Sequence, residues 1–144
     1  MTCHNYGARR ASGGHSLAAM TLTRQRLGRD AEALVANQLA AAGWRIVARN
    51  ARTRHGEIDI IGVDGRDLVF VEVKARRSGS VGGPELPELA VGVTKRRRLR
   101  RLAAAWLAER PPLPRFDDLR FDVVAVTLDG GNGVERYEHI RDAF

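Results

Sequence analysis

The amino-acid sequence predicts an α/β protein whose elements follow one another as helix, three strands, helix and two strands. Two segments, at about 24–42 and 94–110, carry apolar residues at helical spacing, which is typical of helices that pack on a sheet by one face. Shorter runs between and after them are rich in β-branched residues, and Asp64-Gly65 between two of these runs is a favoured hairpin turn. A length of 144 residues suits a single domain with one modest core.

The first helix is predicted from about Arg24 to Ala42, and Gly43 follows as a stop signal. Glu32 lies beside its apolar stripe and either points across to the charged face of the hairpin expected at 56–75 or is an ordinary exposed glutamate. Residues 1–22 have no apolar periodicity and no apolar segment of a secretory signal, so we expect a disordered extension before a single domain at 23–144. The stripe comprises Leu27, Ala31, Leu34, Val35, Gln38, Leu39 and Ala42.

Three strands are predicted after this helix. Trp44–Arg49 is the first, and Gly56–Val63 and Asp67–Ala75 form a hairpin around the Asp64-Gly65 turn. All three runs are short, and they follow the helix without a long connection.

The hairpin is expected to place its acidic residues on one face. With that turn, Asp59 lies opposite Phe70 and Glu57 lies opposite Glu72, so Asp59 and Glu72 are diagonal neighbours about 7–8 Å apart. Side chains alternate along a strand, so one face is charged and the other apolar. The charged face carries Glu57, Asp59, Glu72 and Lys74, with Ile61, Leu68 and Phe70 beside them, and the apolar face carries Ile58, Ile60, Val69, Val71 and Val73.

Asp59 and Glu72 at this spacing can reach toward one divalent cation. Mg²⁺ takes one or two carboxylates together with waters and phosphate oxygens, so the hairpin predicts a site for Mg²⁺ or Mn²⁺. The alternative is a solvated charge cluster in which Lys74 only pairs with Glu72 or Glu57. The apolar residues on the charged face cover it in part, and buried charges require a partner or a metal, which favours the ion.

The second helix, with Thr94 as a candidate N-cap, has a strongly basic face. Cations in a first turn oppose the helix dipole, whereas a helix N-terminus favours phosphate, so this face predicts contacts with a phosphate backbone. The basic residues are Lys95, Arg96, Arg97, Arg98, Arg100 and Arg101, and the buried stripe comprises Leu99, Leu102, Ala103, Trp106 and Leu107. The glycine- and proline-rich segment 78–87 before the helix is either a flap over the substrate or a simple connection.

Two further strands are predicted at Leu119–Leu128 and Val134–Ile140, with a glycine-rich turn between them. Asp122 lies within the first of these strands, and a charged residue in a buried strand requires a partner. We expect a salt bridge with Lys95 or with an arginine of the second helix. Support of a functional site by Asp122 is the second interpretation.

The charge balance indicates a polyanionic partner, with nucleic acid as the leading candidate. The chain has 24 Lys and Arg against 17 Asp and Glu, a formal net charge of +7 and a pI near 10.9. No stretch is apolar for long enough to span a membrane. Cys3 is the only cysteine, which excludes an intrachain disulfide and fits a reducing, cytoplasmic location, and the 4 histidines lack the spacing of zinc ligands.

Several motifs from about residue 24 to the C-terminus together resemble a known family. They are Gly28-Arg29-Asp30-Ala31-Glu32, Arg49-Asn50, Gly56–Ile61, Val69–Lys74, Lys95–Arg98, Arg120–Val124 and Ala143-Phe144. This set resembles the bacterial YraN family, an uncharacterised family similar to the PD-(D/E)XK nuclease superfamily and to archaeal Holliday-junction resolvases. The superfamily pattern is an acidic residue on the first helix, an Asp that opens the core hairpin and Glu-x-Lys on the next strand. Glu32, Asp59, Glu72 and Lys74 match this pattern, whereas Ile58 replaces the Pro that precedes the Asp.

The resemblance implies a restriction-endonuclease-like core, which is a mixed sheet flanked by helices, and metal-dependent hydrolysis of DNA. Asp59, Glu72 and the Val73 carbonyl would hold Mg²⁺ or Mn²⁺, Lys74 would orient the attacking water, and Glu32 would complete the outer shell of the metal. Glu57, on the same face, is a further candidate for support of the site. A branched DNA substrate and a homodimer follow from the likeness to resolvases.

A second function class fits the same basic helix. A protein that binds nucleic acid without cleaving it, as an accessory factor in recombination, repair or DNA uptake, needs the arginines but not the carboxylates. The presence of all four motif residues favours the nuclease. An RNA partner is the weaker prediction, because no strip of aromatic residues for base stacking accompanies the charge.

Overall fold

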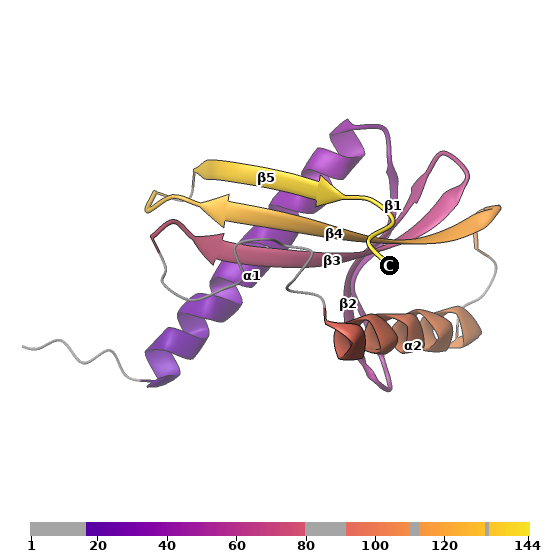
Figure 1. Cartoon of the computed structure of the whole chain (residues 1–144), viewed down its shortest axis with the longest axis horizontal. Helices are drawn as coiled ribbons and strands as arrows, with labels where there is room; N and C mark the ends of the chain where they lie inside the picture. The colour runs from indigo at the N-terminus through magenta and orange to yellow at the C-terminus, as the bar shows by residue number, and fades with distance from the viewer. Residues whose placement is uncertain (1–16, 80–91, 110–112, 132) are drawn as a thin grey trace, which may run out of the picture.

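The computed structural model describes residues 17–79, 92–109, 113–131 and 133–144, and it has the predicted order of elements (Figure 1). Helix α1 (Leu17–Ala41) is followed by strands β1 (Arg45–Thr53), β2 (Gly56–Asp64) and β3 (Asp67–Arg77). Helix α2 (Val93–Glu109) precedes strands β4 (Asp118–Leu128) and β5 (Val134–Ile140). Across these residues, no helix combines the length and the apolar character that a membrane span requires.

The five strands form one mixed sheet in the order β1-β2-β3-β4-β5. All neighbouring strands are antiparallel except β3 and β4, which are parallel. A parallel pair requires a crossover connection, and the segment that contains α2 provides it. Helix α1 covers one face of the sheet and α2 the other (Figure 1). The predicted α/β class with a mixed sheet between helices is therefore confirmed.

Each helix closes its own hydrophobic core. The core on the α1 side contains Val35, Ala36, Leu39, Trp44, Ile60, Val69, Val71, Val124, Val126 and Leu128. The core on the α2 side contains Ala51, Ile58, Ile61, Val63, Leu68, Phe70, Leu99, Leu102, Ala103 and Trp106. The predicted apolar stripe of the second helix is confirmed, with Leu107 partly buried at its margin.

Helix α1 begins at Leu17 rather than near Arg24, so residues 17–22, which the sequence assigned to the extension, are helical. Their side chains are exposed, and the buried positions start only at Ala31. Apolar periodicity requires a surface to pack on, which explains why it marked only the later turns of the helix. Gly43 ends the helix as predicted, with φ at 94°. Residues 1–16 lie outside the described part of the chain.

The β2–β3 hairpin is shifted by two residues from the predicted register. Asp64 pairs with Asp67, so the turn residues are Gly65 and Arg66. Gly65 has a φ of 62°, and a glycine with positive φ in the first central position is the arrangement of a type II′ turn. A shift of two residues leaves every side chain on its predicted face. The charged residues of the hairpin therefore still share one face in the observed register.

Ile58 is an exception to the predicted alternation. It lies in the core on the α2 side, whereas Ile60, two residues later, lies in the core on the α1 side. Residues at this spacing share a face in a regular strand, so β2 must turn over between them. Asn50 on the neighbouring strand has a φ of 47°, which is a left-handed conformation and breaks the regular strand at the same place.

An ionic cluster centred on Arg120 lies on the α1 side of the sheet. The guanidinium donates to Asp64 Oδ2 at 2.8 Å, Asp67 Oδ2 at 2.7 Å and Asp122 Oδ1 at 2.9 Å. It also lies over the ring of Trp44, with 5.5 Å between the guanidinium carbon and the ring centroid. Three carboxylates from three strands therefore share one cation.

Asp122 is fully buried, and the prediction that it forms a salt bridge is confirmed. The predicted partners, Lys95 or an arginine of α2, are wrong, because Asp122 lies on the α1 side of the sheet and α2 covers the other. Besides Arg120, its carboxylate lies 2.8 Å from His139 Nε2 and accepts the Asp142 N–H at 3.0 Å. Burial alone would raise the pKa of Asp122, but the hydrogen bonds from His139 and Arg120 outweigh it and lower the pKa.

Candidate active-site pocket

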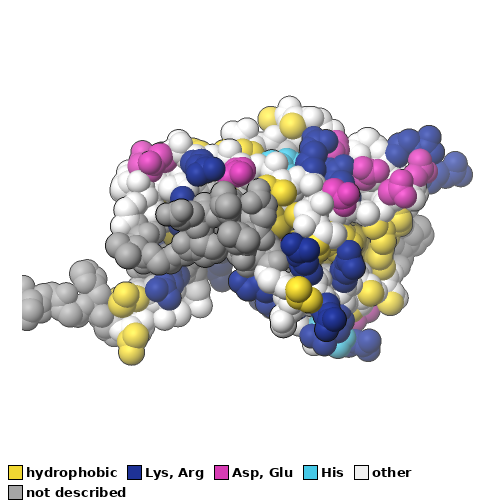
Figure 2. All heavy atoms as spheres, viewed as in Figure 1, with side chains coloured by type: hydrophobic (Ala, Val, Ile, Leu, Met, Phe, Trp, Pro, Cys, Tyr) yellow, Lys and Arg dark blue, Asp and Glu magenta, His cyan; other side chains and the backbone are white. Residues whose placement is uncertain are grey.

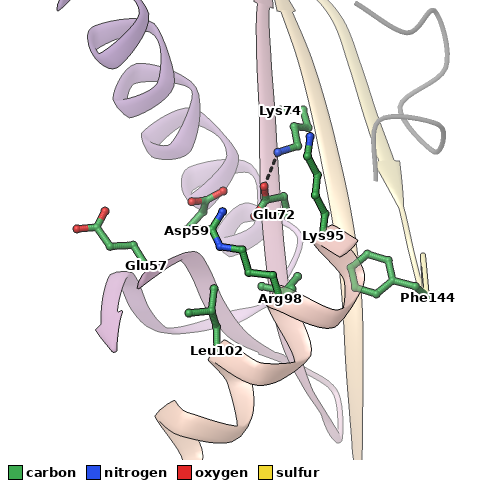
Figure 3. A pocket seen from close by; sticks show the side chains of 9 residues that line it. Glu57, Asp59, Glu72, Lys74, Lys95, Arg98, Leu102 and Phe144 are labelled. Carbon is green, nitrogen blue, oxygen red and sulfur yellow. Dashed lines mark hydrogen bonds and ion pairs between the residues drawn. The ribbon is translucent and has the colours of Figure 1, made fainter. Parts of the chain in front are cut away.

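A pocket of about 420 Å³ opens between the N-terminal half of α2 and the place where β2 separates from β3. Its acidic residues come from the hairpin and its basic residues from both the hairpin and the helix (Figure 3). The lining comprises Glu57, Asp59, Glu72, Lys74, Lys95, Arg98, Leu99, Leu102 and Phe144. The four charged hairpin residues predicted to share a face therefore meet in one pocket, and they meet two of the predicted phosphate-binding residues there.

Asp59 reaches across the gap between the two strands of the hairpin. The last pair between β2 and β3 is Ile60 with Val71, so the next residues on each strand have no backbone partner across the hairpin. Asp59 Oδ2 accepts a hydrogen bond from the Val73 N–H at 2.7 Å, which replaces the missing backbone bond. The N–H and C=O of one residue face the same side of a strand, so the Val73 carbonyl faces this gap too.

The surroundings of Asp59 favour its neutral form. Burial is the largest cause and raises the pKa of Asp59 from 3.8 to about 7, and the charges of Glu72 and Glu32 act in the same direction. The hydrogen bond from the Val73 N–H and the charge of Lys74 oppose this rise without cancelling it. A divalent cation beside Asp59 would reverse the balance, because it stabilises the ionised carboxylate.

We expect the raised pKa to appear as a pH-dependent cost to stability. Between pH 3.8 and about 7, folded Asp59 retains a proton that the unfolded chain releases, so the free energy of unfolding falls as the pH rises through this range. In a chelator at pH 8, Asp59→Asn should therefore be more stable than wild type by on the order of 3 kcal/mol. Urea unfolding at pH 8 and pH 4 measures the difference, which should largely disappear at pH 4. A difference of equal size at both pH values would contradict this origin.

Glu72 and Lys74 form an ion pair within the pocket. The side chains are 28% and 32% exposed, so solvent screens the pair only in part. This is the pairing that the sequence offered as the alternative to an ion site, and it neutralises Glu72 when no cation is present. Glu57 lies at the edge of the pocket (Figure 3). Its carboxylate accepts a hydrogen bond from Arg52 Nε at 2.9 Å.

Glu32 on α1 does not line the pocket, although its charge contributes to the raised pKa of Asp59. Its Oε2 atom accepts a hydrogen bond from Asn50 Nδ2. The Glu32 side chain therefore contacts β1, and Asn50 is a contact residue that the sequence did not assign. The only signal for it was its place in the Arg49-Asn50 motif.

Helix α2 begins at Val93, so Thr94 lies in the first turn and the prediction of Thr94 as N-cap is wrong. The carbonyl of Gly92 accepts the N–H of Lys95 at 2.9 Å and that of Arg96 at 3.1 Å, so Gly92 occupies the capping position. These two backbone hydrogen bonds mark the start of the helix. The predicted flap at 78–87 lies outside the described residues apart from its first two positions.

The basic residues of α2 divide into two groups. Lys95 and Arg98 line the pocket, and Arg98 extends toward Asp59 (Figure 3). The remaining four are Arg96, which is partly buried, and Arg97, Arg100 and Arg101, which are exposed. Figure 2 shows Lys and Arg side chains gathered over the region of α2. The pocket therefore opens beside a basic surface.

Phe144 lines the pocket, although sequence analysis assigned it no role there. Its ring stacks on Phe121, with 5.7 Å between ring centroids. The guanidinium carbon of Arg96 lies over the Phe144 ring, 5.6 Å from its centroid. Phe121 in turn stacks on Phe70 in the core at 5.5 Å. The Ala143 N–H donates to the Phe121 carbonyl at 2.8 Å, which fixes the chain before Phe144. This aromatic series connects the first turns of α2 to the sheet.

The donors in the pocket suit a hard cation. Among the described residues, no group of three or more His, Cys, Asp or Glu side chains is arranged to hold a metal ion. Asp59 and Glu72 supply two carboxylates, and the Val73 carbonyl faces the same gap. Mg²⁺ binds through one or two carboxylates and fills its remaining positions with waters and substrate phosphate oxygens, so this donor set fits Mg²⁺ or Mn²⁺.

The fold and the pocket define a class: an α/β protein with a mixed sheet whose hairpin carboxylates meet the basic end of a crossover helix. The chain belongs to a family described as uncharacterised protein family UPF0102, whose model matches residues 31–126. A UPF0102 protein of Anaeromyxobacter dehalogenans is 50% identical over 121 residues, covering 84% of this chain and 85% of the relative. One of Moorella thermoacetica is 46% identical over 125 residues, covering 87% of this chain and 100% of the relative.

Proposed function

We propose that the protein is a metal-dependent endonuclease of the PD-(D/E)XK type that hydrolyses phosphodiester bonds in DNA. The observation that carries this proposal is the pocket in which Asp59, Glu72 and Lys74 meet Lys95 and Arg98. Carboxylates that suit Mg²⁺ lie beside cations that suit phosphate, so the ion and the scissile phosphate can be bound together. Membership in the family agrees with the motif residues but assigns no activity.

The residues of the pocket have distinct roles in this proposal. Asp59, Glu72 and the Val73 carbonyl would hold the ion. When bound, Mg²⁺ or Mn²⁺ polarises the phosphate and lowers the pKa of a coordinated water. Lys74 leaves its ion pair with Glu72 and turns toward the scissile phosphate. There its ammonium group orients the attacking water and offsets the negative charge of the transition state.

The cations of α2 position the nucleic acid. Lys95 and Arg98 contact the phosphates next to the scissile bond, because their side chains line the pocket. The exposed arginines contact phosphates farther along the strand. Contacts of this kind carry no base sequence, so we expect cleavage to depend on the structure of the DNA. The likeness to resolvases favours a branched DNA substrate and a homodimer with two pockets.

A panel of substrates tests the proposal. The protein is incubated with a four-way junction, a flap, a linear duplex, single-stranded DNA and RNA, each with Mg²⁺, Mn²⁺ or a chelator. We expect cleavage only with a metal ion, fastest for a branched substrate. If wild type binds these substrates but cuts none with either ion, the nuclease proposal is wrong and an accessory binding function replaces it. If it binds none of them, both functions are rejected.

We expect Arg97→Ala combined with Arg101→Ala to weaken DNA binding equally for all sequences. Both residues are exposed on one face of α2, and each lost phosphate contact lowers the slope of log K against log salt by about 0.9. Titrations at several salt concentrations should therefore show a slope smaller by about 1.8. Arg24→Ala combined with Arg26→Ala removes the same charge from α1, on the other face of the sheet, and should leave the slope near the wild-type value. Equal slopes for the two double variants would exclude α2 as the contact surface.

A further inference from the structure

Asn50 adopts a backbone conformation that β-strands do not normally contain. It lies within β1, yet its φ is 47°, and among the described residues Asp142 is the only other non-glycine residue with a positive φ. Asn enters the left-handed region more easily than most residues, but such conformations still persist only where the surrounding structure requires them. They cluster at functional sites, so the position of Asn50 relative to the pocket is informative.

Asn50 lies directly across from Asp59. The residues on either side of Asn50 pair with Ile58 and Ile60, which leaves Asn50 and Asp59 opposite each other. At this point β2 turns over, since Ile58 and Ile60 face different cores. The left-handed residue in β1 therefore lies opposite the place where β2 turns over. Asp59 lies at this place, and its carboxylate accepts the hydrogen bond from the Val73 N–H.

The side chain of Asn50 contacts α1. Its Nδ2 atom donates a hydrogen bond to Glu32 Oε2, and Glu32 is only partly buried. Its charge acts on Asp59, so the two carboxylates repel each other. Without a hydrogen-bond donor beside it, the Glu32 side chain would rotate toward solvent and away from Asp59. The hydrogen bond from Asn50 opposes this movement.

We propose that Asn50 is a positioning residue whose left-handed backbone and side-chain amide hold the Glu32 carboxylate toward Asp59. This inference rests on the proposed function and deepens it, because it makes Glu32 an acidic group of the site although it lies on another element. An amide suits this role for a specific reason. It fixes the direction of a carboxylate and leaves the negative charge in place, whereas a Lys or Arg would neutralise the charge that Glu32 brings to the site.

Substitution of Asn50 by glycine distinguishes the effect of the side-chain amide from that of the left-handed backbone. Asn50→Gly can adopt a φ of 47° without strain and removes only the hydrogen bond to Glu32. Asp142→Gly is the matched control, because Asp142 has a φ of 49° and its backbone N–H, which glycine retains, donates to Asp122 on the α1 side of the sheet. Glu32→Gln removes the charge that Asn50 positions. The double variant Asn50→Gly with Glu32→Gln shows whether Asn50 acts through Glu32.

The test measures the dissociation constant for Mn²⁺ without DNA and the Mn²⁺ concentration that half-saturates DNA cleavage. We expect Asn50→Gly and Glu32→Gln each to raise both quantities by about tenfold, and the double variant also by about tenfold instead of a hundredfold. Asp142→Gly should match wild type. Melting temperatures are recorded for all variants, and Mn²⁺ binding is compared at a temperature at which every variant is folded.

Two outcomes overturn the role of Asn50 and leave the proposed function standing. They are an Asn50→Gly protein that binds and uses Mn²⁺ like wild type, and a double variant whose losses multiply to about a hundredfold, which would show that Asn50 acts independently of Glu32. A wild-type protein that neither binds Mn²⁺ nor cuts DNA overturns the proposed function, and the inference about Asn50 falls with it.

Discussion

Asp59→Asn and Glu72→Gln are each expected to lower the rate of metal-dependent DNA cleavage by on the order of 1,000-fold. Either change removes one of two carboxylates that suit the ion, and a bound ion contributes several kcal/mol of charge stabilisation in the transition state. Both substitutions preserve shape, and the Asn side chain can still accept the hydrogen bond from the Val73 N–H. Single-turnover cleavage assays with Mg²⁺ and with Mn²⁺ measure the loss.

DNA binding by the same variants should be retained, because the phosphate contacts come from α2. Glu138→Gln is the matched control: Glu138 is an acidic residue of β5 that pairs with Arg136 at 2.9 Å, and it does not line the pocket. Its substitution should leave cleavage within about twofold of wild type, as expected for a surface change away from the site. Normal cleavage by Asp59→Asn would exclude this pocket as the site of the reaction.

Arg120→Ala is expected to lower the free energy of unfolding by about 3 kcal/mol or more. The arginine is the shared partner of Asp64, Asp67 and Asp122, and its side chain is only 13% exposed. Without it, Asp122 is left in the core with His139 as its remaining side-chain partner and with two carboxylates nearby. Removing one partner of a buried ion pair is costly because the other charge remains unpaired. Equilibrium unfolding in urea measures the change.

Arg136→Ala provides the comparison for Arg120→Ala. Arg136 forms an ion pair with Glu138 at the surface and is 54% exposed, so its removal should cost no more than about 0.5 kcal/mol. DNA binding by folded Arg120→Ala protein should be unchanged, because the ionic cluster and α2 lie on opposite faces of the sheet. Equal losses of stability in the two variants would show that the ionic cluster does not stabilise the fold.

Local patterns predicted the elements well where packing and pattern coincide. The bounds of β5 are those predicted, and β4 differs by one residue, because each run of β-branched residues ends at a clear turn. The start of α1 and the partners of Asp122 were not predictable in this way. The first turns of α1 extend where no sheet covers them, and the partners of Asp122 depend on which side of the sheet each helix packs, which a single strand does not encode.

The candidate site was predictable as a set of residues but not as a geometry. Alternation along the hairpin was sufficient to place Asp59, Glu72 and Lys74 together, even though the register was wrong by two residues. The role of Asn50 was not predictable, because a left-handed residue inside a strand follows no side-chain pattern. The place of Phe144 in the pocket was also missed, since its contact with Arg96 of α2 joins residues about fifty positions apart in the chain.

The position of Phe144 has a practical consequence for work with the purified protein. Its ring lines the pocket, so any residues fused after it would begin beside the pocket. A polyhistidine tag fused there would bring imidazoles, which bind Mn²⁺, Ni²⁺ and Zn²⁺, next to the very carboxylates whose metal affinity is to be measured. The affinity tag therefore belongs before α1, where the first helical turns are exposed and lead away from the pocket (Figure 1).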